Sequence, residues 1–231
     1  MLIFVMKLLL AHFLGDFVLQ PTKWVKEKSK PKYLGYHILV HVGLLLVLFE
    51  LQWLYWPVYL MVGFSHAAID FVKNYIQNKK NKIFLFLLDQ ALHLFVLMGI
   101  VYWYYPFEIV LQEGDKLKIG LVVLALVLLT EVTAVTIKVL LSNWKLKDSS
   151  LNSAGKYIGI IERLFIFGFI LMHYWEGIGF LLAAKSVFRF GDLNKGNDRN
   201  LTEYVLVGTL LSFGFAIIIA LLVTHFYSII I

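Results

Sequence analysis

The sequence predicts an all-α membrane protein, built as a polytopic bundle of about eight transmembrane helices. Hydrophobic residues make up 60% of its 231 residues, charged residues make up only 16%, and the mean hydropathy is +0.79. A soluble domain of this size has too little interior to bury so many apolar runs, whereas a bilayer covers them. Cysteine is absent, which excludes disulfides and thiolate metal ligands. The net charge of +6 lies mostly in short loops and gives little reason to expect a nucleic-acid partner.

Eight apolar stretches follow one another along the chain. The first is apolar enough for a signal sequence, but it lacks a basic start and a small-residue cleavage site, so we expect a retained helix that ends at Pro21. The second and fourth end in aromatic residues that suit the headgroup region. The stretches at 58–76 and 176–190 are marginal in length for a membrane span, so the expected number of spans is six to eight. The expected helices cover about residues 2–20, 34–56, 58–76, the stretch from the lysine-rich loop to 105, 119–141, 157–174, 176–190 and 201–229.

Lysines gather in alternate loops, namely those after the first, third, fifth and seventh expected helices. Basic loops stay on the cytoplasmic side of a bacterial inner membrane, so both termini are expected outside. We expect a single integral membrane domain with two four-helix halves, 1–105 and 119–231.

Polar pairs interrupt four consecutive apolar stretches at one spacing. Residues at i and i+4 share one face of a helix, and imidazole and carboxylate groups bind zinc, manganese or iron. A lone buried histidine is more often a hydrogen-bonded core residue, and paired histidines and carboxylates also form proton or ion relays. Five of the seven histidines belong to these pairs, however, which favours a metal site. The pairs are His12 with Asp16, His37 with His41, His66 with Asp70, and Asp89 with His93.

The pairs lie at similar depths from the helix ends that are expected to be cytoplasmic, although neighbouring helices run in opposite directions. The sequence therefore predicts eight ligands in one layer that opens to the cytoplasm and holds two or three ions. Zinc is the first candidate, with manganese or iron as alternatives. Asp16, Asp70 and Asp89 are also candidate catalytic residues, and Gln20 and Gln90 beside the pairs are candidate substrate contacts.

The second half places charges within apolar stretches, where they are costly and usually functional. Glu131 is a further candidate as a ligand, a base or an ion-pair partner. Arg163, Lys185 and Arg189 would form a cationic wall that binds a phosphate if it faces the metal layer. The alternative is structural, with Lys185 extending to the interface and Arg189 capping a helix.

The motifs HFLGDFVLQ, H-x3-H, SHxxID and DQxxH, followed by IGxxER, AAKSxxRF and EYxxxGTLLS, extend over nearly the whole chain. Together they resemble a bacterial family of multi-pass membrane proteins, the domain of unknown function 3307. The family likeness implies no reaction. The H-x3-D pairs, His12 with Asp16 and His66 with Asp70, are also similar to the zinc-dependent phospholipase C and P1 nuclease superfamily and to membrane-bound metal-dependent hydrolases. Asp89 with His93 reverses that order.

These observations predict a membrane-embedded, metal-dependent hydrolase that acts on a lipid phosphoester or a lipid-linked anionic substrate from the cytoplasmic leaflet. A divalent-cation or proton-coupled transporter is the main alternative. It would need a polar path to the outer face, where the helix halves are almost wholly apolar apart from Glu50 and Gln52. A metal-stapled scaffold or regulatory partner is the third hypothesis.

Overall fold

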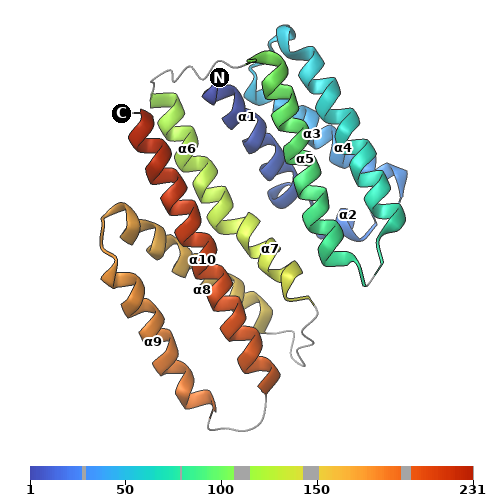
Figure 1. The fold of residues 1–231 in the computed structure, drawn as a ribbon. Coiled ribbons are helices and arrows are strands. Elements are labelled where there is room, and N and C mark those ends of the chain that lie inside the picture. The colour runs from blue at the N-terminus through green and yellow to red at the C-terminus, as the bar shows by residue number, and fades with distance from the viewer. Residues whose placement is uncertain (28–29, 79, 107–114, 143–150, 194–198, 231) are drawn as a thin grey trace. The chain divides into compact units, whose positions relative to one another are not determined.

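The computed structural model describes residues 1–27, 30–78, 80–106, 115–142, 151–193 and 199–230 (Figure 1). Every regular element in this part of the chain is a helix, which confirms the predicted all-α class. The chain divides into two compact units, one of residues 1–124 and one of residues 125–229, so the boundary lies inside a helix.

The first unit is a closed four-helix bundle. Its first helix ends in a π-helical turn, η1, and the first two long helices are separated by a short helix, α2, within the predicted basic loop. α3 packs against α1 and α4, and α5 packs against α4 and α1. The elements are α1 (Leu2–Phe13), η1 (Leu14–Val18), α2 (Thr22–Lys26), α3 (Pro31–Leu48), the 3-10 turn η2 (Trp53–Tyr55), α4 (Trp56–Ile76) and α5 (Lys82–Tyr104).

One end of this bundle has an apolar core. Phe4 of α1 packs its ring against that of Phe49, with 5.3 Å between ring centroids, and Val58 and Ile100 are completely buried beside them. The outward faces are also apolar: Phe64 of α4 is 72% exposed and Phe95 of α5 is 70% exposed. An apolar outer face on a helix bundle is typical of contact with lipid. The predicted polar layer occupies the other end of the bundle.

The unit boundary lies within α6, so the second unit contains the end of that helix and the helices that follow it. α6 (Asp115–Val127), the π-helical turn η3 (Leu128–Val132) and α7 (Thr133–Leu140) follow without a break, where one helix was predicted. α8 (Leu151–Leu171) packs against η3, α7 and α9 (Glu176–Leu193), and α10 (Arg199–Ile230) completes the unit. α8 begins six residues before its predicted start.

Four of the described helices are long and apolar enough to cross a membrane, judged by length and composition. They are Pro31–Leu48, Lys82–Tyr104, Asp115–Leu140 and Glu203–Ser228. This supports a membrane protein, while the count of about eight spans stays a prediction. The predicted helix 34–56 ends early, at Leu48, because Glu50 and Leu51 both adopt the left-handed conformation with φ of 56°.

Candidate metal centre

Asp16 lies on the π-helical turn η1. The Leu19 N–H donates to the Leu14 carbonyl at 2.8 Å, an i to i+5 bond that widens the helix by one residue. π-Turns inside helices occur frequently at functional sites. Nothing in the letters LGDFV distinguishes this turn from a regular helix, so the sequence did not predict it.

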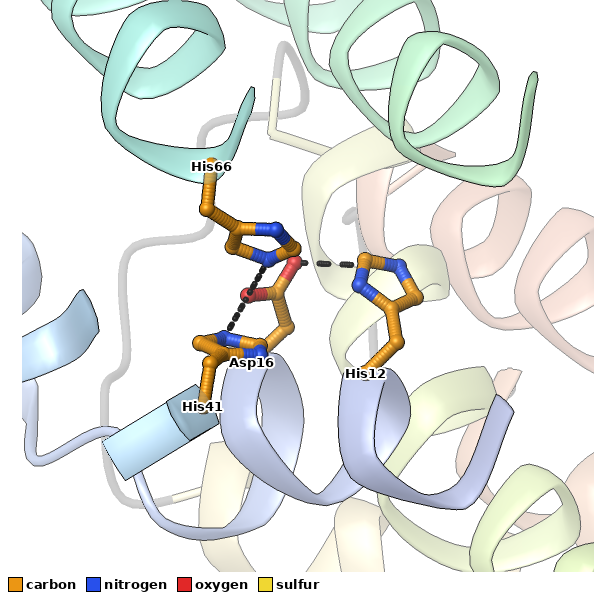
Figure 2. Close-up of side chains that lie close together, drawn as sticks. All are labelled: His12, Asp16, His41 and His66. Carbon is orange, nitrogen blue, oxygen red and sulfur yellow. Dashed lines mark hydrogen bonds and ion pairs between the residues drawn. The ribbon is translucent and has the colours of Figure 1, made fainter. Parts of the chain in front are cut away.

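The Asp16 carboxylate lies among histidine rings from three helices (Figure 2). His41 Nε2 donates to Asp16 Oδ1 at 3.1 Å, and His37 Nε2 lies 3.1 Å from the same oxygen. His66 Nε2 lies 3.7 Å from Oδ1, and His12 Nε2 lies 4.0 Å from Oδ2. The π-turn therefore brings one carboxylate within 4.0 Å of four imidazoles.

His37 is held by partners of its own. Its Nε2 lies 3.3 Å from Asp70 Oδ2, and the Gln20 amide donates to its Nδ1 at 3.3 Å. Because Nδ1 accepts the Gln20 amide, Nε2 is the nitrogen that carries the proton of the neutral ring. His37 thus lies between the Asp16 and Asp70 carboxylates, and neither His37 nor Asp70 belongs to the two groups of candidate ligands described next.

Two groups of side chains could each hold a metal ion. The first is His12, Asp16, His41 and His66, and the second is Asp16, Asp89 and His93. In each group one ligand atom per residue lies within 4.8 Å of the others, so a single ion could contact them after small side-chain adjustments. Asp16 is common to both groups. All eight predicted ligands are therefore brought to one end of the first unit, and six of them form the two groups.

Several nitrogen and oxygen atoms of these groups are buried without a hydrogen bond within the described residues. They include both ring nitrogens of His93, although the side chain is only 1% exposed. Four further atoms are buried without a hydrogen bond within the described residues, namely His12 Nδ1, His41 Nδ1, His66 Nε2 and Asp89 Oδ1. Buried polar atoms nearly always have partners, and leaving one without costs about 1–3 kcal/mol. So many such atoms in one cluster are typical of a site that binds a ligand.

Gln90 links the two groups. Its amide nitrogen donates to Asp16 Oδ2 at 2.9 Å and to Asp89 Oδ2 at 3.2 Å, and its carbonyl oxygen accepts a bond from His12 Nε2 at 3.2 Å. Gln90 was predicted to contact substrate, and in the structure its amide donates to two carboxylates of the centre.

Lys73 is a residue of the centre that the sequence did not predict. Its ammonium donates to Asp89 Oδ2 at 2.6 Å, from the helix turn after Asp70. In the predicted topology Lys73 is one of the basic residues of the loop after the third expected helix. The sequence feature that could have identified Lys73 is its spacing of three residues from Asp70, which places both residues on one face of the helix.

The candidate residues of the second half have partners within the second unit. The Arg163 guanidinium donates to the Leu129 carbonyl, to the Thr130 carbonyl at 3.3 Å and to Ser212 Oγ at 2.9 Å. Lys185 pairs with Glu162 at 2.7 Å, and Glu131, on η3, pairs with Lys156 at 2.8 Å. The side chain of Arg189 lies outside the described residues. That these cations face the metal layer stays a prediction.

Replacing Gly15 by Ala is expected to disrupt the centre. A Cβ at Gly15 would lie 2.4–2.7 Å from the His41 ring atoms, so the ring must move away from Asp16. We expect metal affinity to fall by roughly 10–100-fold, as for loss of a residue that orients a ligand, measured by competition with a fluorescent chelator. The control is Gly43→Ala, where a Cβ meets nothing within 4 Å. Equal affinities for the two variants would contradict the position of His41.

No curated protein and no solved structure matches the chain. The family described as "Protein of unknown function (DUF3307)" matches residues 4–117. The match includes all eight predicted ligands as well as Lys73 and Gln90. It ends before IGxxER and the later motifs, so the resemblance to this family covers a shorter part of the chain than the sequence motifs suggested. The looser likeness to metal-dependent hydrolases gains no support from these comparisons. Through residues 4–117, the chain belongs to the DUF3307 family.

Proposed function

We propose that the first unit holds two divalent metal ions and that the protein is a membrane-embedded, metal-dependent hydrolase. The observation that carries this proposal is the pair of ligand groups that share Asp16. One carboxylate shared by two ligand groups suits a site in which two ions lie about 3.5–4 Å apart. The donors are only nitrogen and oxygen, which suits zinc best and also accepts manganese or iron.

Each residue has a defined part in this proposal. His12, His41 and His66 hold one ion, His93 and Asp89 hold the other, and Asp16 bridges them. His37 and Asp70 orient Asp16, and Gln90 fixes the spacing of the two groups. The bound ions supply a water molecule that is deprotonated near neutral pH.

The reaction that these groups suit is hydrolysis of a phosphoester. The oxygen of the attacking water bonds to phosphorus, the bond from phosphorus to the ester oxygen breaks, and the leaving alcohol takes up a proton. A carboxylate beside the ions would accept the proton of the attacking water, and Asp89 is the candidate for this role.

The surroundings of the centre favour a lipid substrate. The bundle is apolar on its outer face and contains two helices that can cross a membrane. The lysine-rich loops after α1 and α4 lie at the same end of the bundle as the centre, so the positive-inside rule puts it near the cytoplasmic leaflet of the inner membrane. We therefore propose a lipid phosphoester or a lipid-linked anionic compound as substrate.

The apolar end of the bundle argues against the transporter hypothesis. A transported ion needs polar groups on both sides of its binding site. Beyond His12, the described interior of the first unit is filled by residues such as Leu8, Leu45, Leu97 and Ile100. A metal-stapled scaffold would have the same metal centre as the proposed hydrolase, so only an assay of hydrolysis distinguishes the two hypotheses.

The experiment is a hydrolysis assay on protein purified in detergent and loaded with zinc or manganese. The panel contains phosphatidic acid, phosphatidylglycerol and a polyprenyl diphosphate. We expect release of phosphate or a phosphorylated alcohol from at least one lipid, loss of turnover with a chelator, and recovery when metal is returned. In His93→Ala, turnover should fall by roughly 100-fold or more. Metal-loaded protein that hydrolyses none of these lipids would contradict the hydrolase and favour the scaffold. Flux of zinc into vesicles would instead support a transporter.

A further inference from the structure

The outer face of the hairpin formed by α4 and α5 has a groove of about 240 Å³. Its walls are apolar side chains of both helices, including Ile69, Val72, Ile76, Leu85, Leu88 and Leu92. Several of them are open to the outside, with Val72 54% and Leu92 42% exposed. Along α4 the groove runs from Ala68 to Ile76, about 12 Å at the helical rise, which matches a segment of an acyl chain.

Two residues of the groove also belong to the candidate metal centre. Asp89 and Lys73 both line it, and their side chains form the 2.6 Å ion pair. The Lys73 side chain is 17% exposed, and it lines the groove while its ammonium contacts Asp89. Asp89 Oδ1 in turn lies 3.9 Å from His93 Nδ1. The groove therefore leads from the outer surface to the Asp89 and His93 side of the centre.

We propose that this groove is the docking site for a membrane lipid with an anionic phosphate headgroup. The acyl chain lies along the apolar walls, and the phosphate contacts the Lys73 ammonium beside Asp89. When Asp89 binds a metal ion, the ion takes part of its negative charge, and the Lys73 ammonium becomes available to the phosphate. Lys73 is then a substrate-binding residue. This inference rests on the proposed function, since it names how a lipid reaches that same site.

The test uses the full protein reconstituted in vesicles. Phosphatidic acid and phosphatidylcholine are present at equal mole fractions, and in separate samples one of them carries a photoreactive diazirine in its acyl chain. After irradiation, cross-links are mapped by mass spectrometry. At residues 68–92 we expect phosphatidic acid to label the metal-loaded protein about fivefold more than phosphatidylcholine. A ratio near one would overturn the proposal.

Variants identify the residue and the groove. Lys73→Met should bring the ratio to about one, whereas Lys73→Arg, which keeps the charge, should retain it. Lys82→Met is the matched control, because Lys82 is an exposed lysine of α5 that does not line the groove. If Lys73→Met does not fold, Leu88→Trp decides the question. A bulkier side chain there should fill the groove and lower its labelling several-fold, while Leu87→Trp on the same helix should not. Unchanged labelling in Lys73→Met or in Leu88→Trp would overturn the proposal.

Failure of this inference can be told apart from failure of the proposed function. Selective labelling that depends on Lys73, in a protein that hydrolyses no lipid, would support the groove and contradict the hydrolase. Metal-dependent hydrolysis together with unselective labelling would support the hydrolase and contradict the groove.

Discussion

Replacing Asp16 by Asn is expected to remove both metal ions at once. Asp16 is the one residue common to the two ligand groups, and an amide keeps its shape while losing the negative charge. We expect affinity to fall by roughly 100-fold or more at both sites, since even residues that only orient ligands give 10–100-fold losses. Metal content after dialysis against a weak chelator measures this directly. His93→Ala should lose only the ion of the second group.

The matched control is Asp115→Asn. Asp115 is an exposed carboxylate at the start of α6 that belongs to neither ligand group, so this substitution removes the same charge without removing a candidate ligand. Its metal content should equal that of the unmodified protein. If Asp16→Asn retained both ions, or lost only one of them, Asp16 would not be a bridging ligand.

Replacing Arg163 by Met is expected to destabilise the second unit and leave the metal content unchanged. The guanidinium is 2% exposed and donates to two carbonyls of the π-turn η3, which a methionine cannot do. Loss of a donor to a buried carbonyl such as that of Leu129 costs about 1–3 kcal/mol, and the cost is larger where lipid excludes water. Thermal unfolding in detergent should show a clear fall in Tm.

Lys156→Met is the comparison for that variant. It breaks an ion pair with Glu131 in which the side chains are 42% and 31% exposed, and such pairs are worth about 1 kcal/mol or less. Arg163→Met should therefore be the less stable of the two. If it kept its stability and lost only lipid hydrolysis, Arg163 would bind substrate phosphate, as the sequence suggested.

The clustering of the eight candidate residues could be predicted from the sequence because its signal is local. On a helix, spacing alone puts both members of a pair such as His66 and Asp70 on one face, and the lysines of the loops orient successive helices. Antiparallel neighbours then bring the pairs to one depth. The structure does gather all eight residues in the first unit.

What the sequence did not predict depends on contacts between helices. The π-turn at Asp16 occurs where the Gly15 backbone meets the His41 ring, and no periodicity in one helix encodes that approach. The bonds of Gln90 to two carboxylates likewise depend on how α5 packs against α1. Lys73 was overlooked because a lysine near a helix end fits topology as well as it fits a site.

Metal analysis of the wild-type protein tests the central claim most directly. Protein purified gently in detergent is assayed by mass spectrometry for metals and then by X-ray absorption at the edge of the metal found. We expect about two equivalents of zinc, manganese or iron, with only nitrogen and oxygen neighbours at about 2.0–2.2 Å. Folded protein that contains no transition metal and binds none of the three when they are added would contradict the account.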